Sequence, residues 1–126
     1  RFIMEIHESA EDYLETILIL KECTGQVRSI DIATKMNYTK PSISVAMKKL
    51  RENGYIEMDK DGFITLTPSG LEIASNIYER HKVLTGFFVA LGVNEKTAAE
   101  DACKIEHDLS DETFEKIREH ALKTIG

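Results

Sequence analysis

The stretch YIEMDKDGFITLTPSG, residues 55–70, constrains the fold of this 126-residue chain more than any other. It contains two runs of alternating apolar and polar residues on either side of the turn signal Asp61-Gly62. Alternation with period two around such a dipeptide predicts a two-stranded β-hairpin. The apolar positions of its two strands are Ile56, Met58, Ile64 and Leu66. Pro68 and Gly70 then mark the entry to a long helix, so the hairpin separates two groups of helices.

Apolar periodicity and helix-end residues predict three helices before the hairpin and three after it. We expect them at about residues 9–22, 29–36, 41–53, 69–91, 94–107 and 110–123. The proposed N-terminal caps are Ser9, Asn94, and Ser110 or Asp111, and the glycines expected to end helices are Gly25, Gly54 and Gly92. The third helix has Pro41 in its first turn and a buried stripe of Ile43, Met47 and Leu50. The predicted class is mainly α with a small β-hairpin.

Two helices joined by a short turn and followed by a two-stranded hairpin form the winged helix-turn-helix arrangement, in which the third helix reads DNA. The charge distribution agrees with this function. The whole chain carries −6, but residues 28–52 contain six cations and two anions, so this segment carries +4 and the remainder −10. A basic segment of an otherwise acidic chain can bind phosphates locally.

The residues expected to face DNA are small or basic and lie on or beside the third helix and at the wing tip. They are Arg28, Thr39, Lys40, Pro41, Ser42, Ser44, Val45, Lys48, Lys49 and Lys60. Their lysines can neutralise phosphates, and their serine hydroxyls can bond either bases or phosphates. The alternative is that these cations form an ordinary solvated helix face on a winged helix that binds no DNA.

A second candidate site lies in EDACKIEHDLS, residues 100–110, which brings a thiol, a carboxylate and an imidazole together. On one helix, Cys103, Glu106 and His107 share an arc of about 100°. The apolar residues of the same predicted helix lie on its other side: Ala98, Ala102, Ile105 and Leu109. This donor set suits a borderline divalent cation rather than Ca²⁺ or Mg²⁺. The alternative is a solvated helix face.

Three further residues could complete a metal site. Asp12 and Glu15 lie three positions apart on the first helix, so they face the same way, and His81 lies within the long helix. Each also has an ordinary explanation. Asp12 could be a helix-start or capping carboxylate after Ser9. Glu15 could be a surface carboxylate, and His81 could be a surface or satisfied core histidine.

Five segments resemble the iron- and manganese-dependent transcriptional repressor family, the group of the diphtheria toxin repressor and the manganese transport regulator. They are SAEDYLETI, IATKMNYTKPSISVAMKKLRENGYI, ITLTPSGLEIA, YERHKVLTGFFVALGV and EDACKIEHDLSDE, and they follow one another along nearly the whole chain. The resemblance implies a homodimeric winged-helix repressor of metal-uptake genes that binds a palindromic DNA operator when metal is bound. It also implies the metal ligands Asp12, Glu15, His81, Cys103, Glu106 and His107.

The resemblance gives a mixed indication of the metal. Asp12 with Glu15 is the manganese-type pattern, whereas Cys103 stands where manganese-type members have a glutamate. Thr85 and Ala99 occupy positions of ancillary ligands in the iron-type repressor. We therefore expect Mn²⁺, with Fe²⁺ as the alternative and Co²⁺, Ni²⁺, Zn²⁺ or Cd²⁺ as surrogates. Cys103 is left with three roles: a ligand through sulfur, a ligand through its backbone carbonyl, or no ligand.

We predict a winged helix-turn-helix domain over residues 4–71 and a helical metal-binding and dimerisation domain over residues 72–126. The expected dimer contact is an apolar set at helical spacing, Leu84, Phe87, Phe88 and Leu91, for which the alternative is an internal core.

Two other functions were considered. One is a winged-helix regulator that senses a small organic ligand. The other is a di-metal enzyme, which is disfavoured because Glu106 and His107 are adjacent and no repeated Glu-x-x-His motif occurs. We therefore expect no enzymatic activity and no small organic substrate.

The remaining sequence features indicate a cytoplasmic protein. Cys23 and Cys103 are the only cysteines, too few for a disulfide framework, so a reducing compartment is expected. The N-terminal segment RFIMEIHESAED is too short and too acidic for a signal peptide. No apolar run approaches the roughly 18 residues that span a membrane, so no membrane association is expected.

Overall fold

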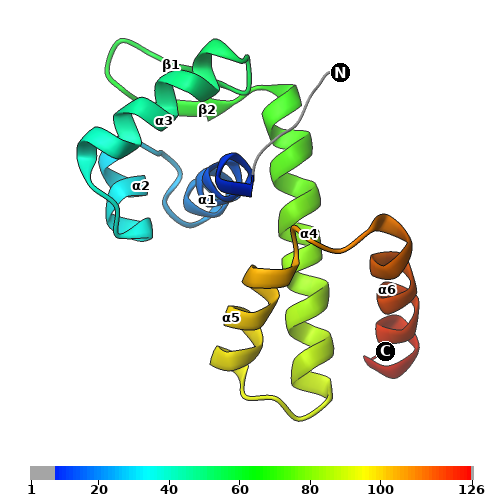
Figure 1. Ribbon diagram of the computed structural model, residues 1–126. Coiled ribbons are helices and arrows are strands. Elements are labelled where there is room, and N and C mark those ends of the chain that lie inside the picture. Colours follow the sequence, from blue (N-terminus) through cyan, green and yellow to red (C-terminus); the bar gives the residue numbers. More distant parts are fainter. Residues whose placement is uncertain (1–7, 126) are drawn as a thin grey trace. The chain divides into compact units, whose positions relative to one another are not determined.

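The computed structural model describes the backbone of residues 8–125 and the side chains of residues 9–121 and 123. Figure 1 shows six helices and one hairpin among them. In chain order the elements are α1 (Glu8–Thr24), α2 (Ser29–Met36), α3 (Lys40–Glu52), β1 (Ile56–Met58), β2 (Ile64–Leu66), α4 (Pro68–Ala90), α5 (Glu95–Ile105) and α6 (Asp111–Ile125). This order confirms the mainly α class with a small hairpin.

The chain divides into two compact units, residues 1–75 and 76–126, with the division inside α4. We call them the N-terminal and C-terminal units. The two domains proposed from the sequence meet at residues 71 and 72, and residues 4–7 of the first lie outside the described part of the chain.

The N-terminal unit is built around one apolar core to which α1, α2, α3 and the hairpin all contribute. The predicted stripe of α3 is confirmed, because Ile43, Met47 and Leu50 are all buried. Leu14 of α1 and Ile32 of α2 are completely buried in the same core. Burial of these branched side chains from three helices fixes α3 against α2 and against β1, which it also contacts.

The turn between α2 and α3 sets where the third helix begins. Asn37 adopts a left-handed conformation at φ 59°, which asparagine tolerates better than most residues. Thr39 then caps α3, since its hydroxyl accepts a hydrogen bond from the Ser42 amide at 3.2 Å. Pro41 follows in the first turn, as expected from the sequence.

The hairpin pairs Ile56 with Leu66 and Met58 with Ile64 in antiparallel register. The connecting turn depends on Asp59, whose Oδ1 accepts hydrogen bonds from the amides of Asp61 at 2.9 Å and Phe63 at 3.0 Å. The segment before α2 adds a further pairing to β2, because the Ile64 amide donates to the Val27 carbonyl at 2.7 Å.

The start of α4 packs tightly against the end of the α3–β1 connection. Thr67 accepts from the Gly70 amide at 3.2 Å and donates to the Gly54 carbonyl at 2.7 Å. A Cβ atom at Gly70 would lie 2.1 Å from the Tyr55 carbonyl oxygen, so this position has no room for a side chain.

The C-terminal unit has a small core of its own, formed by Leu84 of α4, Ala102 of α5 and Phe114 of α6. The predicted cap of α5 is confirmed, because Asn94 accepts from the Lys96 amide at 2.9 Å. Ser110, one of the two proposed caps of α6, accepts from the Thr113 amide at 3.1 Å.

Most helix ends lie within two residues of the expectation, and three of the differences bear on the caps and on the candidate site. Ser9 lies inside α1 and does not cap it, α3 begins at Lys40, and α5 ends at Ile105. Glu106 and His107 therefore lie in the turn that follows α5, not within the helix.

Within the described residues, no helix is both long and apolar enough to cross a membrane.

Candidate metal centre and nucleic-acid interface

The strongest candidate metal ligand is Glu106, the residue that directly follows α5. Its amide still bonds to the Ala102 carbonyl at 2.9 Å, so its backbone keeps the helical direction. Its side chain is completely buried, which is unusual for a glutamate. Two imidazoles lie beside the carboxylate: Nδ1 of His81 is 2.9 Å from Oε1, and Nε2 of His107 is 3.6 Å from Oε2.

The second oxygen of this carboxylate gives a test of whether a cation fits. Oε2 of Glu106 is buried and accepts no hydrogen bond from the described residues. A buried acceptor left unsatisfied costs about 1–3 kcal/mol, and more when charged. A cation beside Oε2 would meet that need, and the neighbouring carboxylate and imidazoles are donors that divalent transition metals accept. The residues present therefore fit such an ion.

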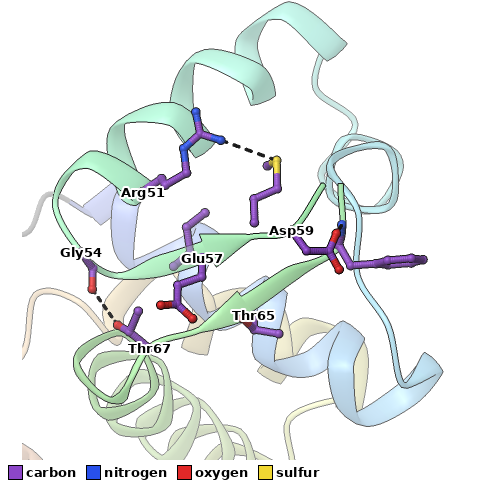
Figure 2. Close-up of a pocket in the computed structure, with 9 residues that line it drawn as sticks. Arg51, Gly54, Glu57, Asp59, Thr65 and Thr67 are labelled. Carbon is purple, nitrogen blue, oxygen red and sulfur yellow. Dashed lines mark hydrogen bonds between the residues drawn. The ribbon is translucent and has the colours of Figure 1, made fainter. Parts of the chain in front are cut away.

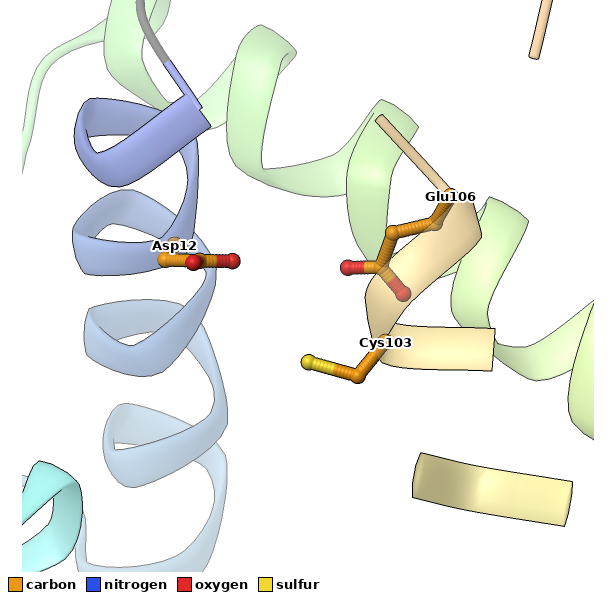
Figure 3. Close-up of side chains that lie close together, drawn as sticks. All are labelled: Asp12, Cys103 and Glu106. Carbon is orange, nitrogen blue, oxygen red and sulfur yellow. The ribbon is translucent and has the colours of Figure 1, made fainter. Parts of the chain in front are cut away.

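Cys103 lies one helical turn before Glu106 and is exposed. Figure 3 shows the two side chains projecting from the end of α5 to the same side. The Cys103 sulfur lies within 4.8 Å of a Glu106 carboxylate oxygen. The structure thus brings Cys103, Glu106, His107 and His81 together within the C-terminal unit. The side chains of Glu106 and His107 are both buried, which contradicts the alternative of a solvated helix face for these two residues.

The two candidate ligands of the N-terminal unit lie on α1, where Figure 3 shows Asp12 projecting from the helix. Asp12 is half-buried, and Glu15 is only 7% exposed.

Burial of Tyr13, followed by its contacts with Tyr38 and with Asp12, raises the pKa of the Tyr13 hydroxyl above its ordinary value. The rings of Tyr13 and Tyr38 meet edge to face with centroids 6.2 Å apart.

The candidate DNA-binding residues all lie on the surface of the N-terminal unit. The exposed set is Arg28, Thr39, Lys40, Pro41, Ser42, Ser44, Val45, Lys48, Lys49 and Lys60. Two of their hydroxyls are already engaged, because Thr39 donates to the Ser42 hydroxyl at 2.9 Å. Among the exposed polar side chains of α3, Ser44 and the lysines are therefore the main candidates to contact DNA.

The wing presents both signs of charge. The Arg28 guanidinium stacks 4.3 Å from the centre of the Phe63 ring, which holds one cation at the turn end of the hairpin. The groove in Figure 2, between the end of α3 and the hairpin, is lined by the carboxylates of Glu57 and Asp59, and Arg51 there bonds to the Met58 sulfur at 3.7 Å. These carboxylates oppose a phosphate, so this groove is not a phosphate-binding surface.

The four residues proposed for dimerisation have different environments. Leu84 is completely buried in the core of the C-terminal unit. For this residue the structure therefore agrees with the alternative of an internal core. Phe88 is half-buried against that core. Phe87 is half-buried and its ring stacks edge to face on His120, 5.9 Å between centroids. Leu91 is 67% exposed and follows the last residue of α4.

Sequence reasoning missed one residue beside the site, Arg80. Its guanidinium bonds to the carbonyl oxygens of Glu106 and Leu109 at 3.0 and 2.7 Å. Because backbone carbonyls are present at every position, these contacts leave no pattern in the sequence. The neighbouring His81 was the only local signal.

Comparisons with known proteins cover both units. The family described as "Iron dependent repressor, N-terminal DNA binding domain" matches residues 5–63, and "Iron dependent repressor, metal binding and dimerisation domain" matches residues 67–123. An uncharacterized HTH-type transcriptional regulator of Methanocaldococcus jannaschii is 41% identical over 113 residues, which are 88% of this chain and 90% of that protein. The transcriptional regulator MntR of Escherichia coli is 33% identical over 120 residues, 94% of this chain and 77% of that protein.

Solved structures show the same fold. A manganese-dependent transcriptional repressor in complex with manganese superposes with a TM-score of 0.81 at 29% identity over 89% of this chain. The match covers 52% of that protein, so this chain spans about half its length.

Proposed function

Because this chain belongs to the iron-dependent repressor family, with matches to both of its domains, we propose that it is a metal-dependent transcriptional repressor. It would bind DNA through the N-terminal unit as a homodimer and repress metal-uptake genes when metal is plentiful. The family favours this reading over a regulator that senses a small organic ligand. A palindromic operator would follow from the twofold symmetry of a homodimer.

One observation carries the metal dependence: the buried Glu106 carboxylate, with His81 at 2.9 Å from one oxygen and the other oxygen unsatisfied within the described chain. In the proposal, His81, Cys103, Glu106 and His107 of the C-terminal unit hold the cation. Asp12 and Glu15 of α1 complete the set, as the family resemblance implies. When bound, a divalent cation supplies the positive charge that neutralises these carboxylates.

The residues of the chain explain how occupancy of the site could control DNA binding. Ligands drawn from both units favour the arrangement of the units that brings all of the ligands together, so occupancy changes the population of that arrangement. In the N-terminal unit, Lys48 and Lys49 are exposed on α3 and free to neutralise phosphates. Ser44 and Val45 lie on the same exposed part of α3 and would contact base edges.

We propose Mn²⁺ as the native metal, with Fe²⁺ as the alternative. The manganese-dependent repressor with the same fold supports Mn²⁺. The oxygen ligands Asp12, Glu15 and Glu106 also suit Mn²⁺, a harder cation than Zn²⁺. Cys103 favours a softer ion, so Co²⁺, Ni²⁺, Zn²⁺ and Cd²⁺ are expected to bind as surrogates.

The experiment that tests this function is a selection from a randomised duplex library, carried out anaerobically with Mn²⁺, with Fe²⁺ and with a chelator. We expect one palindromic sequence to be enriched with either metal and lost with the chelator. The selected duplex is then used to measure affinity against salt. Lys48→Ala should weaken binding and lower the slope of log affinity against log salt by about 0.9, the value of one phosphate contact.

Lys96→Ala is the matched control, because Lys96 is an exposed lysine of α5 in the other unit. It should leave both the affinity and the slope unchanged. Enrichment of the same duplex with metal and with chelator would overturn metal dependence, and failure to enrich any duplex would overturn DNA recognition.

A further inference from the structure

Arg80 of α4 holds the turn that follows α5 by three polar contacts. One guanidinium nitrogen donates to the carbonyl oxygens of Glu106 at 3.0 Å and Leu109 at 2.7 Å. The other donates to Oδ1 of Asp111 at 2.6 Å. The guanidinium carbon also lies 5.0 Å from the centre of the Phe114 ring. The Arg80 side chain is only 14% exposed, so these contacts are largely shielded from water.

The two carbonyl contacts matter more than the ion pair. Asp111 is 97% exposed, and an ion pair with so exposed a partner contributes little. The carbonyls of Glu106 and Leu109, by contrast, lie just past the end of α5, where backbone acceptors have no partner within the helix. A charged donor shared by two such carbonyls fixes the path of the backbone between them. That path contains His107.

The position of Arg80 on α4 links this turn to the candidate metal ligands. Arg80 is followed directly by His81, whose Nδ1 lies 2.9 Å from the Glu106 carboxylate. Two adjacent residues of one rigid helix therefore hold Glu106 in two ways: Arg80 by its backbone carbonyl and His81 by its side chain.

We propose that Arg80 is a positioning residue of the metal centre, which fixes the turn at residues 106–109 so that Glu106 and His107 are preorganised to bind a cation. This inference rests on the proposed function, since it assigns Arg80 a role at that same site. Arg80 is not one of the proposed metal ligands. Its loss should act through the freedom gained by Glu106 and His107, in the way that residues supporting metal ligands tune affinity.

The chain offers a matched control in Arg118 of α6. Arg118 also lies 5.0 Å from the Phe114 ring, and it forms an ion pair with Glu79 at 2.8 Å. Its side chain is 31% exposed. No contact described for Arg118 involves the turn at residues 106–109. Replacing either arginine removes a cation from the same aromatic ring, but only Arg80 supports the ligands.

The test compares the full chain with its Arg80→Met, Arg80→Lys and Arg118→Met variants. Mn²⁺ affinity is measured by calorimetry, the visible spectrum of bound Co²⁺ reports ligand geometry, and urea unfolding without metal reports stability. We expect Arg80→Met to weaken Mn²⁺ binding roughly 10- to 100-fold and to change the Co²⁺ spectrum. Arg80→Lys, which keeps the charge but not the fork of donors, should fall between the wild type and Arg80→Met.

Arg118→Met should bind Mn²⁺ within about twofold of the wild type with an unchanged Co²⁺ spectrum, even if its unfolding midpoint drops, because it does not touch the ligand turn. Equal loss of affinity in Arg80→Met and Arg118→Met would overturn the inference, as would wild-type affinity in Arg80→Met. If Arg80→Met does not fold, Arg80→Lys decides in the same way. Failure of the wild type itself to bind Mn²⁺, Fe²⁺ or Co²⁺ would instead overturn the proposed function.

Discussion

The carboxylate of Glu106 is completely buried in the C-terminal unit, whose apolar core is small. Taking an ionised carboxylate out of water is costly unless partners compensate. The imidazole of His81 lies 2.9 Å from one oxygen, and that of His107 lies 3.6 Å from the other, which accepts no hydrogen bond from the described residues. This combination makes Glu106 the residue on which metal affinity should depend most.

Replacing Glu106 tests this dependence directly. Glu106→Gln keeps the volume but removes the charge, so we expect Mn²⁺ affinity to fall by roughly 30-fold or more, since losing one partner of a buried charge pair costs about 2 kcal/mol or more. Calorimetric titration measures it. Glu100→Gln, an exposed glutamate of the same helix, should leave the affinity unchanged. Equal affinities for both variants would remove Glu106 from the ligand set.

Tyr13 gives a prediction about pH. Burial, and then the neighbouring Tyr38 and Asp12, raise its folded-state pKa above the ordinary tyrosine value of about 10, so the folded chain holds this proton more tightly than the unfolded chain. The stabilisation is complete below about pH 10, and it decreases as pH rises through the unfolded and then the folded pKa.

Tyr13→Phe should therefore lose less stability than the wild type between pH 9 and pH 11, about one unit either side of the ordinary tyrosine value. Urea unfolding at the two pH values measures the difference. Tyr78→Phe, which replaces a tyrosine of the other unit, should follow the wild type. A Tyr13→Phe curve parallel to the wild type would show that this hydroxyl does not control alkaline stability.

At the scale of the elements, close packing at the start of α4 makes a glycine-to-alanine replacement destabilising where it would ordinarily stabilise a helix. Replacing glycine by alanine inside a helix ordinarily gains about 0.5–1 kcal/mol. At Gly70 the added methyl would lie 2.1 Å from the Tyr55 carbonyl oxygen, and backbone cannot move aside cheaply. We expect Gly70→Ala to lower the free energy of unfolding by about 1–3 kcal/mol.

Chemical denaturation of the two variants Gly70→Ala and Ser69→Ala checks this expectation. Ser69 is the exposed neighbour, and its replacement should change stability by no more than about 0.5 kcal/mol. A Gly70→Ala chain at least as stable as the wild type would show that α4 can shift away from Tyr55.

The elements and the candidate ligands were largely predictable from the sequence, whereas the burial of individual residues was not. Gly54 and Asn94 mark helix ends by their own conformational and capping preferences, so local chemistry sufficed to place them. The helical wheel set Glu106 apart from the apolar residues of its helix but could not show that its carboxylate is buried beside His81 of α4. Leu84 fits the spacing of a surface stripe, and only the packing of α5 and α6 on α4 places it inside. Tertiary contacts decided both cases.

At the scale of the whole molecule, the proposed homodimer needs an apolar surface that the monomer leaves uncovered. Leu91 is the most exposed of the large apolar residues on the described surface, at 67%, and Val89 beside it is 38% exposed. Placing a charge there should oppose association, because an unpaired charge is costly to bury. We expect Leu91→Asp to weaken dimerisation by at least tenfold, about 1.4 kcal/mol.

Sedimentation equilibrium across a concentration series measures the dimer constant. Leu71→Asp is the control, because Leu71 is also an exposed leucine, at 45%, but lies in the N-terminal unit. It should dimerise like the wild type. If Leu71→Asp dissociates and Leu91→Asp does not, the dimer contact lies in the other unit.

The short hairpin has a consequence for crowding on a chromosome. A bare strand edge recruits strands from other molecules and so promotes aggregation. Here the Ile64 amide is bonded to Val27, which covers one edge of the sheet, while β1 has only three residues, with Glu57 exposed at its centre. Neither edge offers a long, uncharged row of free amides and carbonyls. Copies gathered at neighbouring sites can therefore remain dispersed, without wings joining into shared sheets.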